Sequence, residues 1–258
     1  MPVNAESHPE SGDHDIDGDA LPINEVFYSL QGEGKLAGTP SVFIRTSGCN
    51  LRCWFCDSYH TSWKPTHSWM SIEDIIDEVR TFDEADHVVL TGGEPLIHEE
   101  SVKLLDELAD YGYHTTVETN GTIYRDTAID LASISPKLRS STPTTERDPD
   151  GEGEWANRHD SRRINLDALR QLVTNYESQL KFVITGADDF EEITDLVERV
   201  RNQTQIAVPD DDVLLMPEGR TRDELADTRT TVAELAMDHG YRYTPRLHVD
   251  LWNDASGT

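Results

Sequence analysis

The stretch GCNLRCWFCD, residues 48–57, holds all three cysteines of the 258-residue chain, in the spacing C-x3-C-x2-C. It follows the β-branched run SVFIRT (41–46), so we expect it to form a loop at the end of a strand. Three thiolates can hold three irons of a [4Fe–4S] cluster and leave the fourth iron open to an outside ligand. A zinc site is the alternative, because His60 follows Cys56 by four residues and could complete a Cys3His tetrahedron.

Further β-branched runs alternate with amphipathic stretches along the chain. They predict strands over 41–46, 87–91, 114–119, 131–135, 180–185 and 213–217. Helices are predicted over 71–82, 99–112, 189–203 and 221–240, and two of them close on a glycine, Gly112 and Gly240. Such alternation is typical of an α/β fold with a parallel sheet, either an open barrel or a wound sheet.

The segments that follow the predicted strands carry the unusual residues. The cysteine stretch follows the first strand, and GGEP, NGT, PK and EG follow the second, third, fourth and sixth. The carboxyl ends of parallel strands hold the active site in α/β proteins, because the loops there converge. We therefore expect one site to be built from these loops.

The chain is expected to contain one folded domain over residues 21–258. Residues 1–20 are polar and acidic and have no periodicity, which predicts a disordered leader. Residues 138–163 are polar, are punctuated by glycine and proline, and lack a periodic apolar face. We expect this segment to be a mobile insertion.

The composition limits the partners of the protein. With 50 acidic and 22 basic side chains, the formal net charge is −28, which disfavours binding to nucleic acid or to anionic membranes. Such a surface stays hydrated in concentrated salt, so we expect a halophilic host. No apolar run approaches the roughly 20 residues that span a bilayer, and the acidic N-terminus differs from a signal peptide, so a cytoplasmic location is expected.

Two motifs carry a resemblance to a known superfamily. The C-x3-C-x2-C stretch with Phe55 before its last cysteine, and TGGEP at 91–95, resemble the radical S-adenosylmethionine (SAM) enzymes. FYSLQGEG (27–34) followed by FIRTSGCNLRCWFCD (43–57) resembles the 7-carboxy-7-deazaguanine synthases within that superfamily, and the likeness runs from about Asn24 to Trp252. The resemblance implies a modified incomplete (β/α) barrel that holds a [4Fe–4S] cluster, SAM and Mg²⁺.

The resemblance also assigns residues to sites. Cluster ligands would be Cys49, Cys53 and Cys56, and Ser58 would bind Mg²⁺. The pterin substrate would contact Leu30, Gln31, Gly32, Arg45, Thr91 and His248. SAM would contact Phe55, Cys56, Asp57, Gly93, Glu94, Glu118, Ser135, Pro136, Lys137, Gln179, Leu180, Lys181 and Phe182. Without the resemblance, Arg45 could equally form an ion pair with a buried carboxylate. Some relatives close the pocket with a terminal proline where this chain has Asp254.

The implied reaction converts 6-carboxy-5,6,7,8-tetrahydropterin into 7-carboxy-7-deazaguanine with loss of ammonia, on the way to the deazapurine bases of tRNA (archaeosine or queuosine). A flavodoxin or ferredoxin would supply electrons, the enzyme would form a homodimer, and it would act on the free base precursor without contacting nucleic acid. Two alternatives stay open, namely an activase of the glycyl-radical type, which shares the cluster motif, and a zinc-stabilised binding protein.

Overall fold

The computed structural model describes residues 19–253, apart from residues 150, 152 and 205. The predicted disordered leader therefore lies outside the described residues except for its last two, of which Ala20 already begins a strand. The position of Asp254 also lies outside them. No helix of the described chain is long and apolar enough to cross a membrane.

The described part of the chain forms one curved, open sheet of nine strands in the order β3-β1-β2-β4-β5-β6-β7-β8-β9. All six predicted strands are present, and each pairs in parallel with the next. They are β2 (Pro40–Thr46), β4 (His87–Gly92), β5 (His114–Thr119), β6 (Leu131–Ile134), β7 (Ser178–Ile184) and β8 (Val213–Pro217). This open parallel arrangement confirms the incomplete α/β barrel, and it brings the carboxyl ends of six strands to one side.

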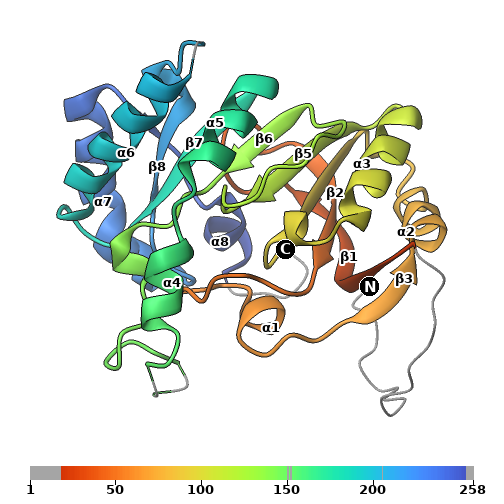
Figure 1. Ribbon diagram of the computed structural model, residues 1–258, viewed down its shortest axis with the longest axis horizontal. Coiled ribbons are helices and arrows are strands. Elements are labelled where there is room, and N and C mark those ends of the chain that lie inside the picture. Colours follow the sequence, from red (N-terminus) through yellow and green to blue (C-terminus); the bar gives the residue numbers. More distant parts are fainter. Residues whose placement is uncertain (1–18, 150, 152, 205, 254–258) are drawn as a thin grey trace.

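All four predicted helices are confirmed as α2 (Ile72–Val79), α3 (Glu100–Asp110), α6 (Asp189–Gln203) and α7 (Arg222–His239). Ser71 caps α2, because its hydroxyl accepts a hydrogen bond from the Asp74 N–H at 3.1 Å. Thr221 and Glu224 form a reciprocal capping box on α7, and Gly240 ends that helix in the left-handed conformation. These helices lie along the outer side of the sheet (Figure 1).

Several elements were not predicted. They are β1 (Ala20–Leu30), β3 (Ser68–Ser71), β9 (Arg242–Tyr243), α1 (Tyr59–Ser62), α4 (Ala156–Arg162), α5 (Leu166–Asn175), α8 (Leu247–Trp252) and the short 3₁₀ turns η1 (Pro95–Ile97), η2 (Arg139–Ser141) and η3 (Asp210–Asp212). β1 pairs antiparallel with β2. A bulge between Ile23 and Glu25 interrupts the alternation of inward and outward side chains, so the sequence pattern does not reveal this strand. Figure 1 shows α1 and α4 at one end of the sheet.

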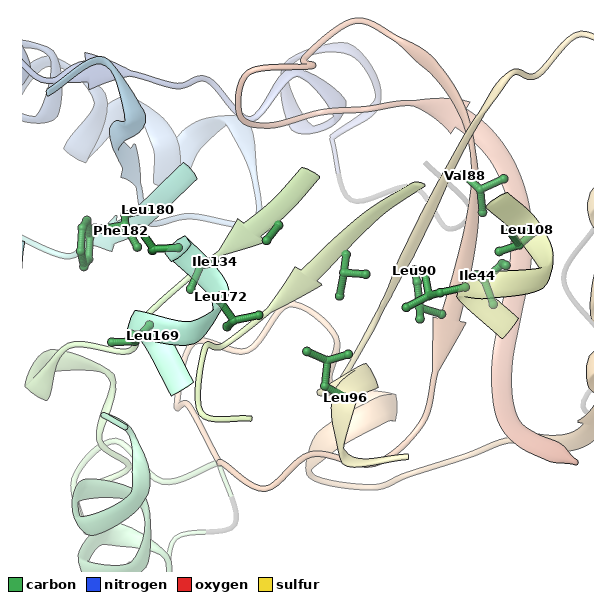
Figure 2. Packing of buried hydrophobic residues seen from close by; sticks show 14 of the residues in the cluster. Ile44, Val88, Leu90, Leu96, Leu108, Ile134, Leu169, Leu172, Leu180 and Phe182 are labelled. Atoms are coloured by element: carbon green, nitrogen blue, oxygen red, sulfur yellow. The ribbon is translucent and has the colours of Figure 1, made fainter. Parts of the chain in front are cut away.

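The hydrophobic core fills the space between the sheet and the outer helices. In β7, Leu180 and Phe182 point into this core together with Leu169 and Leu172 of α5 (Figure 2). Side chains alternate between the two faces of a strand, so Lys181, between them, points to the inner side of the barrel. β7 therefore contributes to both the core and the site.

Replacing Phe182 should test this division of β7. Phe182 is completely buried, so Phe182→Ala should lower the free energy of unfolding by about 3–5 kcal/mol. The neighbouring control Val183→Ala should cost much less, because Val183 is half-buried and faces the cavity. Urea denaturation at constant high salt measures both, and equal losses would contradict the assignment of the two faces.

Candidate active site

The carboxyl ends of the parallel strands surround one cavity of about 1080 Å³. Seventeen of the predicted site residues line it, although they come from segments far apart in the sequence. They are Leu30, Gln31, Gly32, Arg45, Cys49, Cys53, Phe55, Cys56, Asp57, Ser58, Thr91, Gly93, Glu118, Ser135, Lys137, Lys181 and His248. The fold thus brings the predicted cluster, SAM and substrate positions together, while the role of each residue stays a prediction.

Glu94 is one of the predicted SAM contacts, but its side chain points away from the cavity. Its carboxylate is fully buried and does not line the cavity. It accepts hydrogen bonds from the Leu96 N–H (3.1 Å), the Thr119 hydroxyl (2.8 Å) and the Asn120 N–H (2.6 Å). Burial raises the pKa of Glu94 to about 7. Glu94 therefore caps η1 and ties the end of β4 to the end of β5.

Four other predicted SAM contacts also lie away from the cavity. The side chains of Leu180 and Phe182 belong to the core, because they occupy the outer face of β7. Pro136 is buried and does not line the cavity. Gln179 accepts a hydrogen bond from the Lys35 N–H at 2.8 Å and donates to Ser133 at 2.8 Å. Gln179 thus holds the glycine-rich loop after β1 against the sheet.

The three cysteines lie in the loop between β2 and α1, with Cys53 buried and Cys49 and Cys56 partly buried. Burial raises the pKa of the Cys49 thiol to about 12, and it raises the pKa values of the other two thiols as well. Without a compensating cation these thiols stay protonated, whereas bound iron would convert them into thiolates. The donor set therefore fits a metal centre.

The zinc alternative needs the three cysteines and His60, which line the same cavity, to meet at one ion. Among the residues that the structure describes, no three His, Cys, Asp or Glu side chains lie close enough to hold one metal ion. His60, the fourth ligand of the zinc alternative, is exposed and packs edge-on against Tyr59. In a [4Fe–4S] cluster each thiolate binds a different iron, so its ligands need not meet at one point.

The TGGEP turn holds the cysteine loop by backbone contacts. The Glu94 N–H donates to the Gly48 carbonyl at 2.9 Å, and the Gly93 N–H donates to the Thr46 carbonyl at 3.2 Å. A Cβ at position 93 would lie 2.2 Å from the Gly48 oxygen, so only glycine permits this approach. The second motif is therefore required for the shape of the first.

The segment predicted as a mobile insertion contacts the other side of the cysteine loop. The indole of Trp54 donates to the Ser140 carbonyl at 2.7 Å, and the Arg52 N–H donates to Nδ1 of His159 at 3.1 Å. His159 is fully buried, and burial lowers its pKa to about 4, so its ring is neutral and Nε2–H faces the Ser141 hydroxyl at 2.9 Å. Part of 138–163 thus forms η2 and α4, and its mobility stays a prediction.

An ion-pair network that is buried except at Asp57 crosses the cavity wall. Glu33 accepts from Lys181 Nζ at 2.5 Å and from Arg246 Nε at 3.0 Å. Arg246 also pairs with Asp57 beside Cys56, and it donates to the Gly219 carbonyl at 2.6 Å. The burial of Glu33 would raise its pKa, but the two cations outweigh this and hold the pKa well below its ordinary value. The sequence analysis missed Glu33 and Arg246.

The polar side of the cavity combines six predicted residues. The carboxylate of Glu118 accepts from the Gln31 amide at 3.3 Å and from the Thr91 hydroxyl at 2.9 Å, and Lys181 Nζ lies 3.7 Å away. His248 packs so tightly on Gly32 that a Cβ there would lie 1.9 Å from Nδ1. Burial lowers the pKa of His248, which favours its neutral ring.

Arg45 forms the ion pair that was the alternative to ligand binding. Its Nε donates to Glu25 at 2.7 Å, and the two residues lie opposite each other on β1 and β2. Its Nη1 donates to the Ser58 hydroxyl at 2.8 Å. Arg45 also lines the cavity, so the ion pair orients the guanidinium without removing it from the site.

Glu33→Gln should destabilise the fold because it leaves Lys181 and Arg246 without their shared partner. We expect a loss of about 3–5 kcal/mol at neutral pH. The pKa of Glu33 in the folded state lies below the ordinary 4.5. The extra unfolding free energy of wild type over Glu33→Gln is therefore fully present above pH 4.5 and decreases as the pH falls below it. Urea denaturation between pH 4 and pH 8 measures this advantage.

The matched control for this prediction is Glu99→Gln. Glu99 is 83% exposed and lies 3.5 Å from Arg125, so removing this surface pair should cost less than about 1 kcal/mol. Two results would contradict the network. One is a loss of unfolding free energy in Glu33→Gln that is as small as the loss in Glu99→Gln, and the other is a loss that grows as the pH falls below 4.5.

Comparison with known proteins agrees with this geometry. Residues 43–138 match the family model of the radical SAM superfamily. The chain is 65% identical over the full length of both proteins to 7-carboxy-7-deazaguanine synthase from Halobacterium salinarum, and 42% identical to that from Rhodopirellula baltica over 96% of this chain and 92% of the relative. The crystal structure of QueE from Escherichia coli superposes with a TM-score of 0.60 at 26% identity, covering 89% of this chain and 95% of that one. The chain therefore carries a radical SAM domain and belongs to the 7-carboxy-7-deazaguanine synthase family.

Proposed function

We propose that this protein converts 6-carboxy-5,6,7,8-tetrahydropterin into 7-carboxy-7-deazaguanine with a [4Fe–4S] cluster, SAM and Mg²⁺. The proposal is carried by one observation, namely that the three cysteines and the LQG (30–32) and Arg45 positions line the same cavity. A glycyl-radical-type activase would share only the cysteine loop. The family membership of the whole chain therefore supports the synthase over both earlier alternatives.

Three thiols around one cavity suit the proposed cluster and leave one iron for SAM. When bound, the cluster and SAM together supply the radical that removes a hydrogen atom from the substrate. The protein's part is to shield and position the reactants. Trp54 and Phe55, between the second and third cysteines, pack edge-to-face with ring centroids 5.2 Å apart, and Phe55 lines the cavity.

The substrate carboxylate is proposed to bind at Arg45 and Ser58. Two of the five N–H donors of Arg45 are used by Glu25 and Ser58, so donors remain for a planar carboxylate. The Ser58 hydroxyl accepts from Arg45 and lines the cavity. Its oxygen could serve as one ligand of Mg²⁺, with further oxygen atoms from the substrate and from water.

The pterin ring is proposed to lie against Gln31, Thr91 and His248. Glu118 accepts hydrogen bonds from both Gln31 and Thr91. The polar groups that would face the edge of the pterin ring are therefore held in place before the substrate binds. Lys181 and Glu33 fix the loop that carries Gln31, because Glu33 N–H also donates to the Gln31 side chain at 3.1 Å. The ion-pair network thus supports the substrate wall.

The remaining parts of the proposal follow from family and charge. A flavodoxin or ferredoxin as electron donor and a homodimer are carried over from the resemblance. A halophilic way of life is supported by the net charge of −28, because salt screens the repulsion among carboxylates. The same charge supports action on the free base and not on tRNA.

The proposed reaction is tested by anaerobic turnover. Reconstituted protein is incubated in high salt with SAM, dithionite, Mg²⁺ and the carboxytetrahydropterin, and mass spectrometry follows the products. We expect 7-carboxy-7-deazaguanine. Cleavage of SAM without that product would refute the substrate but keep the radical chemistry, and a colourless zinc protein without cleavage would refute both.

Arg45→Ala should raise the KM for the pterin by roughly 10- to 150-fold, the factor that corresponds to one charge-assisted hydrogen bond. SAM affinity should stay unchanged, as isothermal titration can show. Glu25→Gln is the matched control, since it removes the ion pair but keeps the guanidinium. Arg45 has only a structural role if Glu25→Gln raises the KM as much as Arg45→Ala does. The same conclusion follows if Arg45→Ala also lowers the affinity for SAM.

A further inference from the structure

Ser62 lies at the end of α1, directly after the cysteine loop, and no sequence motif pointed to it. Its side chain is buried, with 2% of the residue exposed, and it lines the cavity. Its hydroxyl lies 3.1 Å from Sγ of Cys56. The carbonyl of Ser58, one helical turn earlier, is the competing acceptor at 3.4 Å.

The sulfur is the better acceptor of the two. Sulfur has a larger radius than oxygen, yet the contact to sulfur is the shorter one. An iron-bound thiolate has no S–H to donate, so in the loaded enzyme the hydroxyl can only be the donor. A hydrogen bond from the Ser62 hydroxyl therefore stabilises the thiolate form of Cys56.

Hydrogen bonds to the sulfur ligands set the reduction potential of an iron–sulfur cluster. Reduction adds one electron, and the added negative charge spreads onto the thiolates. An O–H dipole directed at a thiolate therefore stabilises the reduced cluster more than the oxidised one. Cys49 receives a backbone bond from the Leu51 N–H at 3.4 Å, but the bond to Cys56 comes from a side chain and can be removed by substitution.

We propose that Ser62 is a positioning residue that donates to the Cys56 thiolate and thereby makes the cluster easier to reduce. One electron enters from an outside reductant, and Ser62 keeps its proton throughout. The inference rests on the cluster of the proposed function and not on the pterin substrate. A redox measurement without substrate therefore separates its failure from that of the proposed reaction.

The test is a redox titration of reconstituted Ser62→Ala, with dithionite as reductant and the reduced cluster followed by EPR. We expect the equilibrium constant for one-electron reduction to fall about tenfold, which corresponds to a shift of 59 mV to lower potential. The matched control is Thr61→Val. Thr61 is equally buried on the same helix, but its hydroxyl donates to the Ser58 carbonyl at 2.8 Å and not to sulfur, so its loss should leave the potential unchanged.

Ser62→Thr keeps the hydroxyl and serves as the rescue variant. If Ser62→Ala binds less iron than wild type, the hydrogen bond from Ser62 is also needed to retain the cluster. Ser62→Thr must then restore both the iron content and the reduction potential. The inference is overturned if Ser62→Ala is loaded at the wild-type potential. It is also overturned if Thr61→Val shifts the potential equally, or if Ser62→Thr fails to restore what Ser62→Ala changes.

Discussion

Three cysteine thiols, one buried and two partly buried, lie in one loop at the carboxyl ends of the strands, and the site depends on how that loop is held. Buried thiols resist ionisation, as the raised pKa of Cys49 shows, so the loop favours a cation that converts them into thiolates. The loop backbone is fixed on one side by the turn at Gly93 and Glu94, and on the other by the buried ring of His159. The parallel sheet supplies the first support, because β2 and β4 end side by side, and helix α4 supplies the second.

The distribution of charge separates the surface of the protein from its site. The sequence has more than twice as many acidic as basic side chains, yet Lys181, Arg246 and Arg45 are gathered around the cavity. Each of them is paired with a carboxylate, which offsets the cost of removing it from water. Glu33, between two cations, joins the loop after β1 to β7 and to the segment before α8. These ion pairs therefore hold the charged side chains of the site in fixed positions.

The parts of the structure that depend on local pattern could be predicted. The β-branched runs gave the six parallel strands, and cysteine spacing gave the loop. The pairing of Glu33 with Arg246 could not be found, because the two residues are 213 positions apart and no local pattern connects them. The sequence also does not show that three donors enclose the Glu94 carboxylate away from the cavity. For Phe182, a signal was present in the sequence. Side chains alternate between the two faces of β7, so Phe182 and its neighbour Lys181 cannot both point into the cavity.

The central claim is that three thiols hold a cluster with one iron left open, and Mössbauer spectroscopy tests it most directly. The protein would be reconstituted with ⁵⁷Fe and measured with and without SAM. We predict a [4Fe–4S] signal in which SAM changes the parameters of one iron in four. A signal that SAM leaves unchanged, or a protein that binds zinc and no iron, would contradict the account.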